Sequence, residues 1–176
     1  MSAKTEIKQR TASLHEAGHC VAAWSLRAKV FWARISQDSP GNGKTKFFGT
    51  GIILHDVAIL FSGVRAVHTY AHRLNIPSAG GYFRFWTHGD GARINFLTAG
   101  MPRKQRKRMI YTGQELADIV LNNNESSVIE LSRRLYAAGY LAGRMLDDVK
   151  GDVKIFDSSN GISFKPVVAQ PVRGLR

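Results

Sequence analysis

Two histidines and a glutamate near the start of the chain form the pattern that most clearly predicts a chemistry. The segment His15-Glu16-Ala17-Gly18-His19 is an HExxH motif. On an α-helix, residues four apart lie on one face, so both imidazoles can bind one metal ion. Zinc held there would lower the pKa of its bound water and polarise a carbonyl, while Glu16 accepts a proton as the water attacks. The motif predicts a zinc metalloendopeptidase, with His15 and His19 as metal ligands and Glu16 as the general base.

A zinc site of this kind needs a third protein ligand. The extended pattern HExxHxxGxxH is excluded, because Ala22 and Ser25 stand where its glycine and third histidine would be. A downstream glutamate is also disfavoured, because no glutamate occurs between Glu16 and Glu115. Three aspartates and four histidines remain in the interval: Asp38, Asp56, Asp90, His55, His68, His72 and His88. Of these, Asp90 has the fewest structural explanations, because it stands between two glycines at the start of a short predicted helix.

The motif must be positioned by a helix, and the surrounding sequence predicts one. From Glu6 to about Ala28 there is no proline, and apolar residues recur at helical spacing. Residues 30–36 are rich in β-branched and aromatic types and predict a strand, followed by the turn cluster 38–43. A returning strand over 46–53 would complete a small β-hairpin after the motif helix.

Further helices are expected beyond this hairpin. The pattern predicts helices over 56–74 and 90–97, and one or two helices over 112–148. Residues 78–87 are expected to form an irregular loop or short strand, and Asn160-Gly161 predicts a tight turn between strands at 153–156 and 162–164. We therefore expect one α+β, predominantly helical, zincin-like domain over residues 1–165, with a loosely ordered tail over 166–176.

The segment from Thr11 to Trp24, TASLHEAGHCVAAW, resembles the peptidase domain of FtsH, the ATP-dependent membrane protease, whose motif helix typically reads HEAGHAxxA. Residues 60–66 resemble the second helix of that family, and residues 87–94 resemble its segment rich in glycine and aspartate. The aspartate of that segment is the third zinc ligand in the family, so the resemblance implies Asp90 as the third ligand here. The helical stretch 116–148 is similar to the helices that close the family's domain.

FtsH proteins carry a membrane anchor and an ATPase module before the peptidase, and this chain contains neither. Without a motor, only flexible or unfolded polypeptide could enter a zinc cleft, so we expect the substrate to be of that kind. The peptide would lie extended beside an exposed strand edge, with the hairpin of residues 30–53 as a candidate.

The formal net charge of the chain is +12. Such a charge favours acidic partners, which include nucleic acid, an anionic membrane surface and acidic proteins. The densest basic run comprises Arg103, Lys104, Arg106, Lys107 and Arg108. A solvated loop or helix start would explain this run without a ligand. The alternative function is therefore a basic regulatory protein on a peptidase-like scaffold, binding nucleic acid or an acidic protein through this run.

Two further features bear on the compartment. Cys20 is the single cysteine, so no intramolecular disulfide can form, which fits a reducing compartment. The first nineteen residues are polar and charged, and the longest apolar stretch, Val57 to Phe61, is far shorter than the ~20 residues that span a bilayer. We expect a soluble, cytoplasmic protein without a membrane span.

Overall fold

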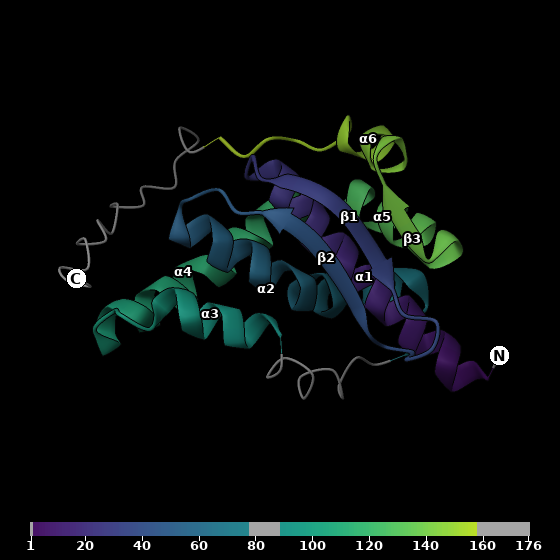
Figure 1. Ribbon diagram of the computed structural model, residues 1–176, viewed down its shortest axis with the longest axis horizontal. Helices are drawn as coiled ribbons and strands as arrows, with labels where there is room; N and C mark the ends of the chain where they lie inside the picture. Colours follow the sequence, from purple (N-terminus) through teal and green to yellow (C-terminus); the bar gives the residue numbers. More distant parts are fainter. Residues whose placement is uncertain (1, 78–88, 158–176) are drawn as a thin grey trace, which may run out of the picture.

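The computed structural model describes residues 2–77 and 89–157. It confirms an α+β fold that is mostly helical, with a small antiparallel sheet (Figure 1). The elements in chain order are α1 (Ala3–Ser25), β1 (Lys29–Ile35), β2 (Gly43–Phe48), α2 (Ile53–Tyr70), the 3-10 helix η1 (Ala71–Leu74), α3 (Asp90–Thr98), α4 (Arg103–Asn122), α5 (Glu125–Ala138), β3 (Tyr140–Ala142) and α6 (Arg144–Lys150).

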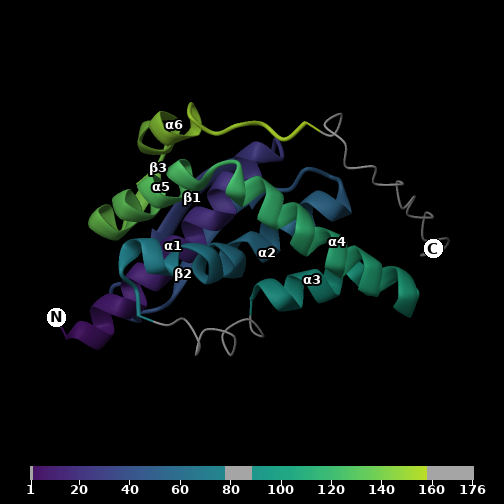
Figure 2. The same ribbon diagram turned by 180° about the vertical axis from the view of Figure 1, so that it is seen from behind.

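The motif helix α1 is the central element of the fold. Its first turn is capped by Ser2, whose hydroxyl accepts a hydrogen bond from the Thr5 amide at 3.2 Å. With the exception of His15, every residue from Thr11 to Ser25 is buried, although many are alanine, serine or glycine. Small side chains let the neighbouring backbones approach closely. The helix therefore packs against α2 and α5 on one side and against the sheet on the other (Figures 1 and 2).

The sheet has the strand order β2-β1-β3, with both pairings antiparallel. The cross-strand set Ala33, Thr45 and Leu141 is buried and points towards α1. Residues on the alternate positions point away from α1, as the period of two in a β-strand requires. In Figure 1 the sheet lies in front of α1.

Two hydrophobic clusters meet at α1. One joins α1 to α5, β1, β3 and α6, with Trp24, Leu131 and Leu135 among its members. The other joins the end of α1 to α2, α3 and α4, with Phe61 and Leu116 among its members. Because α1 contributes to both clusters, the position of its histidines is fixed by most of the core.

Several predicted boundaries are corrected. Strand β2 spans residues 43–48 rather than 46–53, because the chain leaves the sheet where Asp56 accepts hydrogen bonds from the Thr50 amide and hydroxyl at 2.8 and 3.1 Å. Helix α4 begins at Arg103, nine residues before the predicted start at Thr112, so the basic run forms its first turns. The end of the stretch 112–148 contains β3, which was not predicted.

The predicted strand over residues 153–156 is wrong. Its backbone bonds irregularly to other parts of the fold: the Phe156 amide donates to the Ser25 carbonyl at 2.8 Å, and the Lys154 amide donates to Asn124 Oδ1 at 2.6 Å. The predicted loop at 78–87, the turn at 160–161, the strand at 162–164 and the tail at 166–176 lie outside the described residues. None of the helices in the described part of the chain has the length and apolarity needed to cross a membrane.

The close crossing of α1 and α2 gives a stability prediction. A Cβ on Gly18 would lie 2.5 Å from the Ser62 carbonyl oxygen and 2.7 Å from Ala66 Cβ, so Gly18→Ala must push the helices apart. Overpacking of this kind costs about 1–3 kcal/mol. We expect Gly18→Ala to lower the free energy of unfolding by that amount in urea titration. Gly100→Ala is the control, because nothing lies within 4 Å of its Cβ. Equal stability of the two variants would contradict the close contact of α1 and α2 at Gly18.

Candidate metal centre

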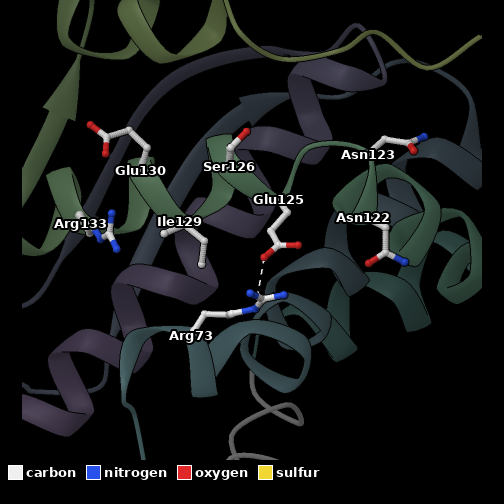
Figure 3. A pocket seen from close by; sticks show the side chains of 8 residues that line it. All are labelled: Arg73, Asn122, Asn123, Glu125, Ser126, Ile129, Glu130 and Arg133. Atoms are coloured by element: carbon white, nitrogen blue, oxygen red, sulfur yellow. Dashed lines mark ion pairs between the residues drawn. The ribbon is translucent and has the colours of Figure 1, made fainter.

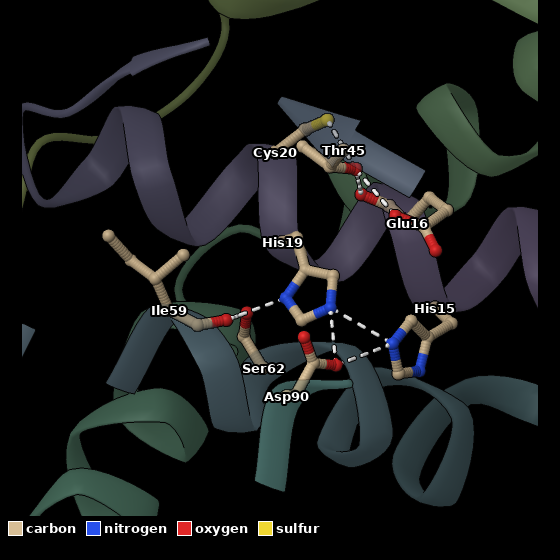
Figure 4. A network of polar contacts seen from close by, with 8 residues as sticks. All are labelled: His15, Glu16, His19, Cys20, Thr45, Ile59, Ser62 and Asp90. Atoms are coloured by element: carbon tan, nitrogen blue, oxygen red, sulfur yellow. Dashed lines mark hydrogen bonds and ion pairs between the residues drawn. The ribbon is translucent and has the colours of Figure 1, made fainter. Parts of the chain in front are cut away.

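Helix α1 and the first residue of α3 bring three ligand-type side chains together (Figure 4). His15 Nε2 and His19 Nε2 lie 2.9 Å apart, and each lies 3.0 Å from Asp90 Oδ2. Within residues 2–77 and 89–157, these three side chains are the one group of three or more potential metal ligands that lie close together. The two histidines and the aspartate singled out in the sequence are therefore neighbours in space, although Asp90 is far from the motif in the chain.

The other candidate ligands do not join this cluster. Asp56 is engaged by Thr50 at the entrance to α2, and Asp38, His55, His68 and His72 are not part of the group. His88 lies outside the described residues. Among the described residues, Asp90 is thus the one candidate for the third metal ligand that lies beside His15 and His19.

A second layer of hydrogen bonds orients His19. Its Nδ1–H donates to the carbonyl of Ile59 on α2 at 2.7 Å, and the Ser62 hydroxyl donates to the same carbonyl at 2.6 Å. A carbonyl oxygen can only accept, so the hydrogen bond places the proton on Nδ1. The lone pair of a neutral His19 is then on Nε2, the atom that faces His15 and Asp90. Such outer partners fix the orientation and basicity of metal-bound imidazoles.

The spacing of the three atoms suits a tetrahedral ion. Zinc bonds of 2.0–2.2 Å at tetrahedral angles place ligand atoms roughly 3.3–3.6 Å apart. The separations of 2.9–3.0 Å are slightly shorter, so small side-chain rotations would be enough. Gly63 on α2 leaves room for both rings, because a Cβ there would lie 2.5 Å from His19 Nε2 and 2.6 Å from His15 Nε2.

The electrostatics of the cluster favour a cation. Burial by itself lowers the pKa of His19, but the charge of Asp90 and its hydrogen bond outweigh burial and raise that pKa to about 9. Burial raises the pKa of the Asp90 carboxyl, yet the charge of His19 and hydrogen bonds from both imidazoles hold it far below its usual range. The site therefore stabilises a positive charge between these side chains, which a proton or a metal ion can supply.

The centre is partly open to solvent. The side chains of His15 and Asp90 are 16% and 21% exposed, whereas that of His19 is 5% exposed. A metal ion bound by three protein atoms would thus be reachable from the side of His15 and Asp90. Catalytic zinc sites share this composition of three protein ligands and one open position.

Glu16 is held beside the sheet rather than free in solvent. The Thr45 hydroxyl on β2 donates to Glu16 Oε2 at 2.7 Å, and a Cβ on Gly43 would lie 2.6 Å from Glu16 Oε1. The charge of Glu16 contributes to the raised pKa of His19, so the carboxylate is within electrostatic reach of the cluster.

Cys20 contributes no thiolate here, because burial raises its pKa to about 12.

The supporting residues were missed by sequence reasoning. The motif is contacted from other elements by Thr45, the Ile59 carbonyl, Ser62, Gly43 and Gly63. Residues 62 and 63 lie in the segment 60–66 that resembles the second helix of the FtsH family, but no role was predicted for either. The glycines at 43 and 63 are the available sequence signal, since a glycine inside a helix or strand often marks a close approach.

A concavity away from the cluster lies between η1, the end of α4 and the start of α5, and polar residues make up most of its lining (Figure 3). Its central feature is an ion pair between Arg73 Nε and Glu125 Oε1 at 3.4 Å. Asn122, Ser126 and Arg133 also line it. Arginine, asparagine and glutamate make up most of this lining and histidine is absent from it, so its set of side chains differs from the cluster of His15, His19 and Asp90.

Comparison of the sequence with protein-family models and with curated proteins finds no match. The assignment of chemistry to the cluster therefore depends on its residues and their geometry.

The charges in the metal-free centre predict a pH-dependent stability. The pKa of His19 is raised from its ordinary 6.5 to about 9, so its protonation contributes stability that is fully present below about pH 6.5 and lost as the pH rises through 9. We expect the free energy of unfolding of chelator-treated protein to fall over this interval. Asp90→Asn should remove most of the slope, because the main cause of the raised pKa is gone. The same slope in both proteins would contradict the coupling of His19 to Asp90.

Proposed function

We propose that this protein is a zinc-dependent endopeptidase with a zincin-like active site, acting on flexible or unfolded polypeptide. The observation that carries the proposal is the convergence of two imidazole nitrogens and one carboxylate oxygen within 3.0 Å, next to a glutamate of the same helix. The resemblance of residues 11–24 to the FtsH peptidase domain supports the same conclusion.

The donor set supports zinc as the metal. Two histidines, one carboxylate and one open position are typical of catalytic zinc, and they also occur in non-haem iron(II) sites. The neighbouring Glu16 favours hydrolysis, because an acid–base group beside the metal is what attack by water requires. When bound, zinc would lower the pKa of coordinated water and polarise the scissile carbonyl.

The side chains of the chain itself would then have separate roles. His15, His19 and Asp90 hold the metal, and the Ile59 carbonyl keeps the His19 ring in place. Glu16 accepts the proton of the attacking water and passes it to the leaving amine nitrogen. The hydrogen bond from Thr45 to Glu16 Oε2 restricts the carboxylate to one side of α1, which pre-orients the base.

The sheet suggests how a polypeptide would bind. Strand β2 is an edge strand of the described sheet, and its residues Gly43 and Thr45 contact Glu16. An extended peptide that pairs with this edge would run beside the general base, which is the mode known as β-strand addition. Folded proteins seldom offer an unpaired extended segment, so the proposed substrate is flexible or unfolded polypeptide.

The test is the isosteric substitution Glu16→Gln. It removes the base but leaves the ligands, so we expect zinc content near the parent value and a loss of cleavage by about 100-fold or more, within the range that general acid–base catalysis supplies. Cleavage would be followed with fluorescently labelled, unfolded casein, and zinc by elemental analysis of the same samples.

Glu130→Gln is the matched control, since Glu130 lies on α5 and pairs with Arg134 at 2.7 Å, away from the motif. It should cleave at the rate of the parent. The mechanism is contradicted if Glu16→Gln binds zinc, remains folded by circular dichroism and cleaves as fast as the parent.

A further inference from the structure

The face of the sheet that points away from α1 combines aromatic rings with cations. The register sets Lys29 opposite Phe48, Trp32 opposite Lys46 and Ala142, and Arg34 opposite Lys44 and Tyr140, all on this outward face. Phe31 lies at the irregularity between Val30 and Trp32 and carries two lysines over its ring. We define the platform as these outward residues: Lys29, Phe31, Trp32, Arg34, Lys44, Lys46, Phe48 and Tyr140.

The rings and cations of the platform are in contact with one another. The ammonium groups of Lys29 and Lys46 lie 5.2 and 5.7 Å from the centroid of the Phe31 ring. The guanidinium carbon of Arg34 lies 5.4 Å from the Trp32 ring centroid. The rings of Trp32 and Tyr140 are 6.4 Å apart and tilted by 37°. The outward face therefore holds two groups of rings and cations, one around Phe31 on β1 and β2 and one around Trp32 on β1 and β3.

No carboxylate offsets this charge within the sheet. The three strands contain three lysines and one arginine, namely Lys29 and Arg34 on β1 and Lys44 and Lys46 on β2, and they contain no aspartate or glutamate. Among the described residues, the ion pairs involve other arginines and the two ligand histidines, and none involves these four cations. No ion pair with a described residue therefore neutralises these four cations.

Three aromatic side chains of the platform are exposed to solvent in the structure. Phe31, Phe48 and Tyr140 are 39%, 72% and 49% exposed. Burying a large aromatic side chain lowers the free energy, so three rings exposed on one face indicate a surface that a partner could contact favourably.

We propose that this platform binds single-stranded nucleic acid. Unpaired bases stack on aromatic rings and on arginine planes, and lysines beside the rings neutralise the phosphates. The flexible lysine side chains can move from the face of Phe31 to a phosphate, which leaves the ring free for a base. An acidic peptide would use the cations alone. A membrane surface would require rings that project beyond the cations, whereas here the cations lie over the rings.

The platform is separate from the metal centre. Thr45 points inward to Glu16, whereas its neighbours Lys44 and Lys46 point outward, so α1 is on the opposite side of the sheet. The basic run at the start of α4 is a third location, since its Arg106 donates to Asn95 of α3 at 2.6 Å. Binding at the platform requires neither zinc nor Glu16, and this proposal is independent of the peptidase proposal.

The test is fluorescence anisotropy of a labelled 15-nucleotide oligothymidylate titrated with the full chain at several salt concentrations. Lys44→Gln combined with Lys46→Gln should weaken binding and reduce the slope of log affinity against log salt by about 1.4, from about 0.7 for each lost phosphate contact. Phe31→Leu retains an apolar side chain without the ring, and we expect it to weaken binding about fivefold or more.

The chain offers matched controls. Lys104→Gln combined with Lys107→Gln removes the same charge from exposed positions on α4, and Phe96→Leu removes a ring that is 83% exposed on α3. Both should bind as the parent does. The proposal is overturned if the α4 variant loses as much affinity as the platform variant, or if duplex of equal length competes as well as the single strand. Absence of oligonucleotide binding, with or without binding to anionic vesicles, would also overturn it.

Discussion

The structure depends on the close crossing of α1 and α2. Gly18 lies against the Ser62 carbonyl, so a side chain there would force the helices apart. Gly63 lies against the imidazoles of His15 and His19, so a side chain there would displace the two rings. This approach brings the Ile59 carbonyl within 2.7 Å of His19 Nδ1 and so fixes which nitrogen faces Asp90. Since α1 contributes to both hydrophobic clusters, the core that stabilises the fold also holds His15 and His19 in place.

A single helix thereby serves several surfaces. One face of α1 presents the histidines towards α2 and α3, and another places Glu16 against β2, where Thr45 holds its carboxylate. The side chains on the outward face of the sheet make no contact with Glu16, because successive side chains of a strand point to opposite faces. The outward residues of the sheet can therefore be cations and aromatic residues. Part of the positive charge of the chain lies on this face, and another part lies at the basic start of α4.

The local pattern of the sequence predicts part of this arrangement. The motif helix, strand β1 and helix α3 follow from periodicity and turn residues, and Asp90 was the aspartate with the fewest structural explanations. Strand β3 could not be predicted, because three residues after the left-handed Gly139 carry little signal until β1 is available to pair with them. Residues 153–156 have strand-like composition, but Ser25 and Asn124 take up their backbone groups. Thr45 and Gly63 were missed since their roles arise only from tertiary contact.

The central claim is that His15, His19 and Asp90 together bind one zinc ion. The most direct measurement is elemental analysis of tag-free protein after zinc is supplied and the excess removed, with Asp90→Ala measured beside the parent and iron and manganese determined in the same samples. We expect about one zinc per parent chain and little retained zinc in a variant that remains folded, since one of three protein ligands is gone. A parent that retains no zinc, or a folded variant that retains as much zinc as the parent, would contradict the claim.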